Sequence, residues 1–194
     1  MVTLSKLPRF TFRIDSNVML QSWDCSFKDT RKSDYVVGLC CAALGADRFV
    51  LDIERDRMDL PETLMAVRRL SARNPRAMLK LVEDKANGPA VIQSLKHEIG
   101  GFVEVSPDGS KMARAAAAAP MLEAGNWYLP HPKLFPWVDQ LIAEMAGFPA
   151  GAHDDIVDAW SQAAKRLIVV GPKAIRPKAP IMERIPNSPN AWAF

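Results

Sequence analysis

Acidic residues fall at three places in this sequence that the order of its elements should bring together. They are Asp24 in one apolar run, Glu83 and Asp84 at the end of another, and Asp154, Asp155 and Asp158 at the start of a helical segment. An ionised carboxylate in or beside a hydrophobic strand costs several kcal/mol unless it is paired or binds a cation. Oxygen ligands without a cysteine or histidine set suit Mg²⁺ or Mn²⁺. Two such ions bridged by one aspartate can activate water and stabilise a departing phosphate-ester oxygen.

The acids of the helical segment also have a purely structural explanation. Asp155 and Asp158 are three residues apart, so their side chains share one helix face. Carboxylates in a first helical turn are favoured by the helix dipole, with Asp154 or His153 as the cap. Capping does not explain Asp24 or Glu83, so the metal-binding interpretation depends on the strand acids.

The first half of the chain contains the elements that must position these acids. Three strand-like runs, residues 18–27, 33–44 and 47–57, are joined by short polar links, which predicts consecutive antiparallel hairpins. Asp59 and Glu62 then form a capping-box pattern that opens a helix. A strand over residues 77–84 follows this helical crossover, and we expect it to lie parallel to its neighbour.

The second half is mostly helical. Its expected elements are a helix over 89–99, a strand over 101–105, a helix over 111–124 bent near Pro120, a strand over 126–129, and helices over 134–146 and 155–169. The whole order predicts an α/β fold, with a mixed sheet flanked by helices.

Length and composition favour a single globular domain. The chain has 194 residues, of which 48% are hydrophobic and 24% charged, and this excludes disordered and coiled-coil classes. No apolar stretch is long enough to span a bilayer and the N-terminus lacks a secretory signal, so we expect no membrane partner. Three cysteines without ligand spacing indicate reduced, buried thiols in a cytoplasmic protein.

Charge and proline divide the chain into three parts. We expect an N-terminal arm or linker over residues 1–17, the domain over 18–169, and a proline-rich basic tail over 170–194. The net charge is +3, and the tail carries all of it, with four basic residues against one acid. Five prolines exclude a regular helix there, so the tail should be extended.

Four segments in order resemble a known family. They are QSWDCSFKDTRKSDYVVG, LVEDKANGPAVIQSL, GSKMARA with EAGNWYLPHP, and GFPAGAHDDIVDAWSQA. From about Leu7 to Lys165 the chain resembles the C-terminal nuclease domain of tailed-phage terminase large subunits. The resemblance implies an RNase H-like fold, in which three antiparallel strands are followed by parallel strands with helices on both faces. It also implies a DNA endonuclease that uses two Mg²⁺ or Mn²⁺ ions during genome packaging.

The resemblance assigns roles residue by residue. Asp24 matches the bridging metal ligand of the first strand. Glu83 matches the acid at the end of the fourth strand, although Asp84 fits some relatives. Strand alternation puts only one of the two on the metal face, and we favour Glu83 while keeping both. Asp155 matches the ligand on the last helix, and Asp158, one turn on, matches the ligand of resolvase-type relatives.

Basic residues near these acids would contact the substrate, double-stranded DNA. Lys111 and Arg114 resemble the basic pair that precedes the family's long helix, and Lys85 adds a third cation. Full terminases also carry a packaging ATPase, but this sequence has no GxxxxGK[ST] phosphate loop. We therefore expect an excised domain or the product of a split prophage gene. Its partners would be a separate or missing ATPase domain, the portal and the small terminase in the host cytoplasm.

Two other functions fit the same residues. A junction resolvase or integrase would share the fold and prefer branched DNA. A non-catalytic prophage relic would dock on DNA or on the packaging machinery without cutting.

Overall fold

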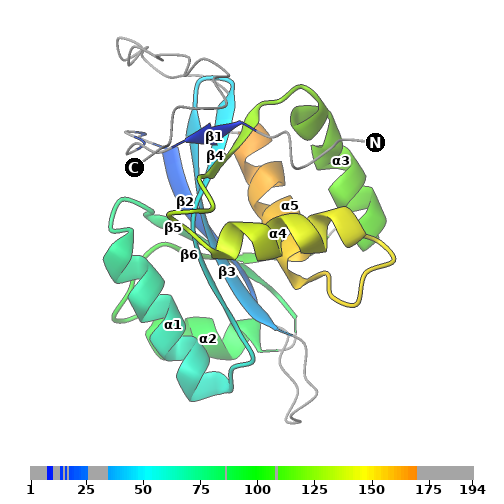
Figure 1. Ribbon diagram of the computed structural model, residues 1–194. Helices are drawn as coiled ribbons and strands as arrows, with labels where there is room; N and C mark the ends of the chain where they lie inside the picture. The colour runs from blue at the N-terminus through cyan, green and yellow to red at the C-terminus, as the bar shows by residue number, and fades with distance from the viewer. Residues whose placement is uncertain are drawn as a thin grey trace.

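The computed structural model describes residues 8–10, 14, 16, 18–25, 35–85, 87–107 and 109–169. Along these residues the elements are β1 (Arg9–Phe10), β2 (Val18–Asp24), β3 (Val36–Leu44), β4 (Asp47–Asp56), α1 (Leu60–Arg73), β5 (Leu79–Glu83), α2 (Gly88–Leu95), β6 (Phe102–Val105), α3 (Lys111–Glu123), β7 (Trp127–Pro130), α4 (Trp137–Gly147) and α5 (Asp155–Val169). The strands form one mixed sheet in the order β1-β7-β4-β3-β2-β5-β6. The α/β class expected from the sequence is confirmed (Figure 1).

The centre of the sheet is the predicted antiparallel meander. β2 pairs with β3 and β3 with β4, and the two-residue link between β3 and β4 contains Gly45 at a φ of 60°. A positive φ suits the tight turns that join adjacent strands, and glycine adopts it without steric cost. β5 returns parallel to β2 after the α1 crossover, as expected, and β6 is parallel to β5. β7 pairs parallel to β4, and the sequence analysis made no prediction about this pairing.

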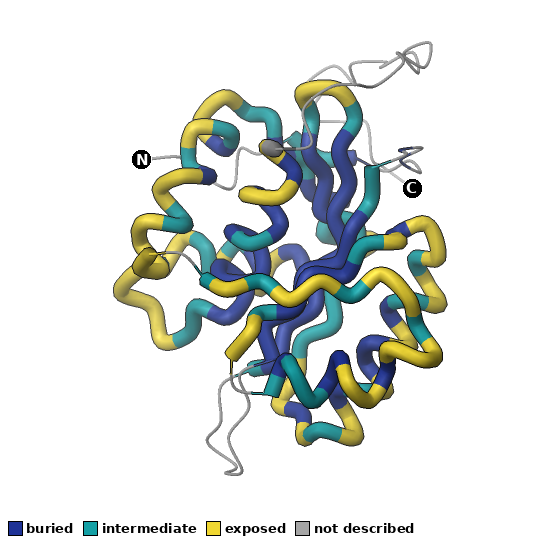
Figure 2. The backbone as a smooth tube through the Cα atoms, turned by 180° about the vertical axis from the view of Figure 1, so that it is seen from behind, coloured by how far each residue is buried: buried dark blue, intermediate teal, exposed yellow. Residues whose placement is uncertain are grey.

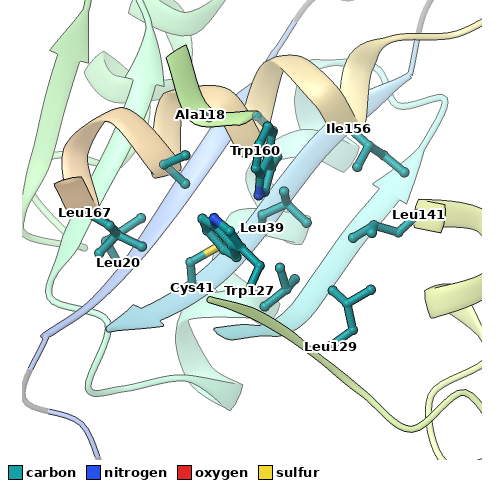
Figure 3. Packing of buried hydrophobic residues seen from close by; sticks show 14 of the residues in the cluster. Leu20, Leu39, Cys41, Ala118, Trp127, Leu129, Leu141, Ile156, Trp160 and Leu167 are labelled. Atoms are coloured by element: carbon teal, nitrogen blue, oxygen red, sulfur yellow. The ribbon is translucent and has the colours of Figure 1, made fainter. Parts of the chain in front are cut away.

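Two helical layers enclose this sheet. α3, α4 and α5 share one hydrophobic cluster with one face, and α1 and α2 share another cluster with the opposite face. The central strands are consequently buried along most of their length (Figure 2). Figure 3 shows the first cluster, in which Trp160 of α5 lies 5.5 Å from Trp127 of β7, between ring centroids. A sheet covered on both faces leaves polar strand residues room only where a strand ends or where they find a partner.

The predicted N-terminal arm contributes to the sheet. Arg9 and Phe10 pair with β7, and Phe10 packs edge-on against Phe49 with ring centroids 5.6 Å apart. Ile14 is also buried. A two-residue strand carries no periodic pattern, so sequence reasoning missed it. The predicted tail over 170–194 lies outside the described residues.

Most of the predicted helices are found, with shifted ends. The capping box of α1 is present: Glu62 N donates to Asp59 Oδ1 at 2.8 Å, and Asp59 N donates to Glu62 Oε2 at 3.0 Å. α2 ends at Leu95 rather than at residue 99, and α4 begins at Trp137 rather than at residue 134. Pro120 lies inside α3, which continues to Glu123.

The three cysteines are buried and free, as expected. Burial and the nearby Asp52 carboxylate raise the pKa of Cys40 to about 12. None of the helices in the described ranges is long and apolar enough to cross a membrane.

Side chains of opposite charge hold the two ends of α5. At its N-terminus, Ile156 N donates to Glu144 Oε1 of α4 at 2.5 Å. The other carboxylate oxygen of Glu144 forms an ion pair with Arg55 at 2.9 Å, and both side chains are largely buried. At the C-terminal turn, Arg48 Nη2 donates to the carbonyl of Leu167 at 3.0 Å. Each charge has the sign that the helix dipole favours, and each satisfies a group that lacks a partner within the helix.

The Glu144 contact makes a testable prediction. Glu144→Gln keeps an acceptor for Ile156 but leaves the Arg55 guanidinium mostly buried without its counter-ion. We expect the free energy of unfolding to fall by about 2–4 kcal/mol in urea denaturation. The matched control is Glu98→Gln, which breaks an Arg–Glu pair that is exposed on both sides and should leave the urea midpoint unchanged. Equal midpoints for the two variants would show that the buried Glu144–Arg55 ion pair does not stabilise the fold.

Candidate functional site

Two of the predicted acids are neighbours on one face of the sheet. Trp23 pairs with Val82 in the last step of the parallel ladder of β2 and β5, so the register brings Asp24 and Glu83, the next residue of each strand, side by side. Leu20 and Leu81 lie on the α5 side of the sheet, and strand alternation places Asp24 and Glu83 on that side too. Asp24 is only 3% exposed. Burial, followed by the charges of Asp24 and Glu83, raises the pKa of the Cys25 thiol, so both carboxylates act on the same neighbourhood.

The structure separates the two acids that the sequence analysis kept as alternatives. Asp84 is exposed, and its backbone N–H donates to the carbonyl of Val105 at 2.9 Å. Alternation from Val82, which packs among α1 and α2, turns Asp84 toward the opposite face. Trp23 packs in that same cluster, as expected. Glu83 is therefore the acid that shares a face with Asp24.

The start of α5 brings a third acid to this end of the sheet. Tyr35 N donates to Asp155 Oδ2 at 3.4 Å, and Tyr35 lies two residues before Val37, the partner of Asp24 in the β2–β3 ladder. Farther along α5, Gln162 Nε2 donates to Ser22 Oγ at 3.0 Å, which fixes the helix along β2. Asp155 is 4% exposed. The ends of β2 and β5 and the start of α5 therefore bring Asp24, Glu83 and Asp155 to the same end of the sheet.

Asp158 lies in a different environment from the one expected. Both of its oxygens are in ion pairs, Oδ1 with Arg114 Nη2 at 2.6 Å and Oδ2 with Lys111 Nζ at 2.7 Å. Lys111 also pairs with Asp154 at 2.8 Å. Burial alone would lower the pKa of Lys111, but the hydrogen bonds to Asp154 and Asp158 outweigh it and raise that pKa. Lys111 and Arg114, which we expected to contact DNA, are therefore paired with acidic residues at the start of α5.

The remaining predicted cation, Lys85, is exposed. Its Nζ lies 3.6 Å from Glu83 Oε1, at the opening of the loop that follows β5. A Cβ on Gly88 in this loop would come within 2.0 Å of the Glu83 carbonyl, so only glycine allows the loop to turn back so closely.

Sequence reasoning missed Glu144 and the aromatic neighbour of Asp155. The Tyr35 ring lies edge-on to His153 with centroids 4.9 Å apart, and the Arg55 guanidinium carbon lies 3.7 Å from the centre of the Tyr35 ring. His153 Nδ1 is 4.0 Å from Asp155 Oδ2. No local pattern marks these residues, because each contact joins segments that are distant in sequence or lie in a loop. In the sequence, Glu144 is an ordinary polar position of an amphipathic helix.

The donor set fits a hard cation in its chemistry. Asp24, Glu83 and Asp155 offer carboxylate oxygens, which Mg²⁺ and Mn²⁺ prefer. Within the described part of the chain, no three histidine, cysteine, aspartate or glutamate side chains are grouped closely enough to hold a metal ion. The three acids therefore lie at one end of the sheet without being drawn together into a closed set of ligands.

Comparison with known proteins gives the family. A search of curated proteins found no match. Among solved structures, the large terminase nuclease from thermophilic phage G20c with bound magnesium is similar, with 14% identity over 84% of this chain and 95% of that chain and a TM-score of 0.61. The large terminase nuclease domain from bacteriophage SPP1 with bound manganese has 14% identity, 84% and 89% coverage and a TM-score of 0.53.

A longer relative is also similar. The large terminase of another thermophilic bacteriophage has 9% identity over 81% of this chain but only 42% of its own, with a TM-score of 0.61. These likenesses confirm the expected RNase H-like fold. The sequence model described as the terminase RNaseH-like domain matches residues 21–167, and the chain therefore belongs to that family.

Proposed function

We propose that this domain is an endonuclease that hydrolyses phosphodiester bonds of double-stranded DNA with two divalent ions, Mg²⁺ or Mn²⁺. The observation that carries the proposal is the parallel register of β2 and β5, which places Asp24 beside Glu83 at the end of the sheet where α5 presents Asp155. Family membership supports it, as do similar terminase nucleases whose structures contain magnesium or manganese.

Each acid has a part in this proposal. Asp24, Glu83 and Asp155 would hold the two ions, with Asp24 as the ligand common to both. When bound, two such ions activate the attacking water and stabilise the leaving 3′ oxygen. The chain's own contribution is to hold the carboxylates on rigid elements, through the strand ladder for Asp24 and Glu83 and through the Glu144 contact for α5.

The basic residues near the acids neutralise carboxylates and position DNA phosphates. We propose that Asp158 anchors Lys111 and Arg114 beside the acids, and that it becomes a metal ligand only where an ion replaces Lys111 at Oδ2. Lys111 is about half exposed and Arg114 is mostly buried, so the lysine is the one able to turn toward a DNA phosphate. Lys85 is exposed on the Glu83 side and contacts phosphate there.

The working unit in this proposal includes a packaging ATPase. The chain covers 95% of the G20c nuclease but 42% of the longer large terminase, so it corresponds to the nuclease portion of such a protein. We propose that the ATPase, the portal and the small terminase are its partners in the host cytoplasm. Translocation would then be supplied by the ATPase and cutting by this domain.

Plasmid cleavage tests the assignment. Supercoiled plasmid should be nicked and linearised in Mn²⁺ or Mg²⁺ and remain intact in EDTA. Asp24→Asn, Glu83→Gln and Asp155→Asn should each reduce the cleavage rate on the order of 100-fold or more, because each removes a ligand charge. Asp84→Asn is the matched control, one residue from Glu83 but on the other face, and should cut like the wild type.

The outcomes separate the alternatives. Activity lost in Asp84→Asn and retained in Glu83→Gln would reverse the choice between these acids. A strong preference for four-way junctions over linear duplex would favour a resolvase. Absence of cleavage in every metal, with the chain folded by circular dichroism, would favour a non-catalytic docking domain.

Metal binding can be measured without activity. An ion that binds only the folded chain stabilises it, by about 2.7 kcal/mol when its concentration is 100 times Kd. We expect Mn²⁺ at about 10 mM to raise Tm by several degrees, and EDTA to reverse the increase. Asp155→Asn should lose at least half of this shift. Asp154→Asn, which removes a carboxylate paired with Lys111, should keep it, and equal losses in both variants would contradict the ligand assignment.

A further inference from the structure

Arg57 lies on the same face of the sheet as the acids, just beyond the end of β4. The β3–β4 ladder pairs Val37 with Arg55 and Val36 with Asp56, so Tyr35 and Arg57 continue the register beyond it. Val37 also pairs with Asp24 and packs on the α5 side of the sheet. Tyr35 and Arg57 therefore lie on the same face as Glu83 and Asp24, two residues beyond their row at the same end of the sheet.

The surroundings of Arg57 hold its charge in place without neutralising it. Its guanidinium carbon lies 5.0 Å from the centre of the Tyr35 ring, within the range of a cation–π contact. The Tyr35 ring is in turn held by Arg55, whose guanidinium lies over it, and by His153 at its edge. Arg57 is exposed, and within the described residues its guanidinium makes no ion pair.

The other cations of the site are already paired. Lys111 and Arg114 bind Asp158, and Arg55 binds Glu144. Arg57 thus differs from them in offering a full positive charge to a partner. It sits two strands from β2 and two residues beyond the row of Asp24, which puts the two backbone positions about 12 Å apart at the usual strand spacing and rise. That separation suits a phosphate next to the one being cut, rather than the reacting phosphate itself.

We propose that Arg57, oriented by Tyr35, binds a backbone phosphate of the DNA on the β4 side of the acids. This inference rests on the proposed nuclease function and adds to it a contact that positions the duplex. Arginine pairs with phosphate through a planar fork of donors, and an aromatic ring beneath it limits the orientations of that fork. Such a contact adds affinity for any sequence, because phosphates carry no base information.

Salt dependence of DNA binding tests the proposal. Binding of a fluorescent duplex is measured by anisotropy in Mg²⁺ at several salt concentrations, in the Asp24→Asn background to prevent cleavage. Adding Arg57→Gln should weaken binding about tenfold and should reduce the slope of log K against log salt by about 0.9, the value for one phosphate contact. Arg57→Lys keeps the charge and should restore most of both values.

The matched control removes a charge from the opposite side of the sheet. Lys96, the exposed C-cap residue of α2, is changed to glutamine in the same background, and neither affinity nor slope should change. Equal slopes for Arg57→Gln and the background, or equal losses for Lys96→Gln, would overturn the inference about Arg57. Circular dichroism of each variant verifies that the fold is intact.

Different experimental results would contradict the nuclease proposal and the Arg57 proposal. If the wild type cuts plasmid and Arg57→Gln binds DNA as tightly as its background, the phosphate contact is wrong and the nuclease stands. If the wild type neither binds nor cuts DNA in any metal, both proposals fall together.

Discussion

The geometry of the acids depends on how α5 is held. Its N-terminus is fixed by the Glu144 carboxylate and its last turn by the Arg48 guanidinium, so the helix is bound at both ends by charges that its dipole favours. Between these contacts, Trp160 and Leu167 pack into the core of the sheet. A helix held in this way cannot rotate without losing both contacts and its apolar packing. Asp155 consequently keeps one position relative to the end of β2.

The sheet imposes the complementary constraint. Because helices cover both faces, a carboxylate in its centre would have neither water nor a partner, and the cost would be several kcal/mol. Asp24 and Glu83 lie instead at the last positions of β2 and β5, where Glu83 is partly exposed and Asp24 is still buried. The fold therefore gathers acids at one edge for reasons of burial. Carboxylates this close repel one another. Lys111 and Arg114 relieve this repulsion at Asp158, and we propose that divalent ions relieve it at Asp24, Glu83 and Asp155.

The sequence predicted well whatever depends on local pattern. The hairpins, the capping box at Asp59 and Glu62, and the parallel return of β5 follow from periodicity, cap chemistry and the handedness of crossovers. It could not decide between Glu83 and Asp84, because alternation fixes only that the two residues face opposite ways. The choice needed the register with Trp23, which is a tertiary fact. Ion pairs such as Lys111 with Asp158 were missed for the same reason, since both groups were assigned to other partners.

The distribution of charge explains how a domain with little net charge could hold DNA. The net charge of +3 is carried by the segment from residue 170, so the preceding chain is neutral. Nonspecific attraction to a polyanion then has to come from local cations rather than from the overall field. Near the acids, Arg114 is neutralised by Asp158, whereas Arg57 rests on an aromatic ring and keeps its charge available. A duplex drawn toward Arg57 would lie across the ends of β4, β3 and β2 in turn, which brings a phosphate to Asp24 and Asp155. Affinity would thus be concentrated where cutting is proposed.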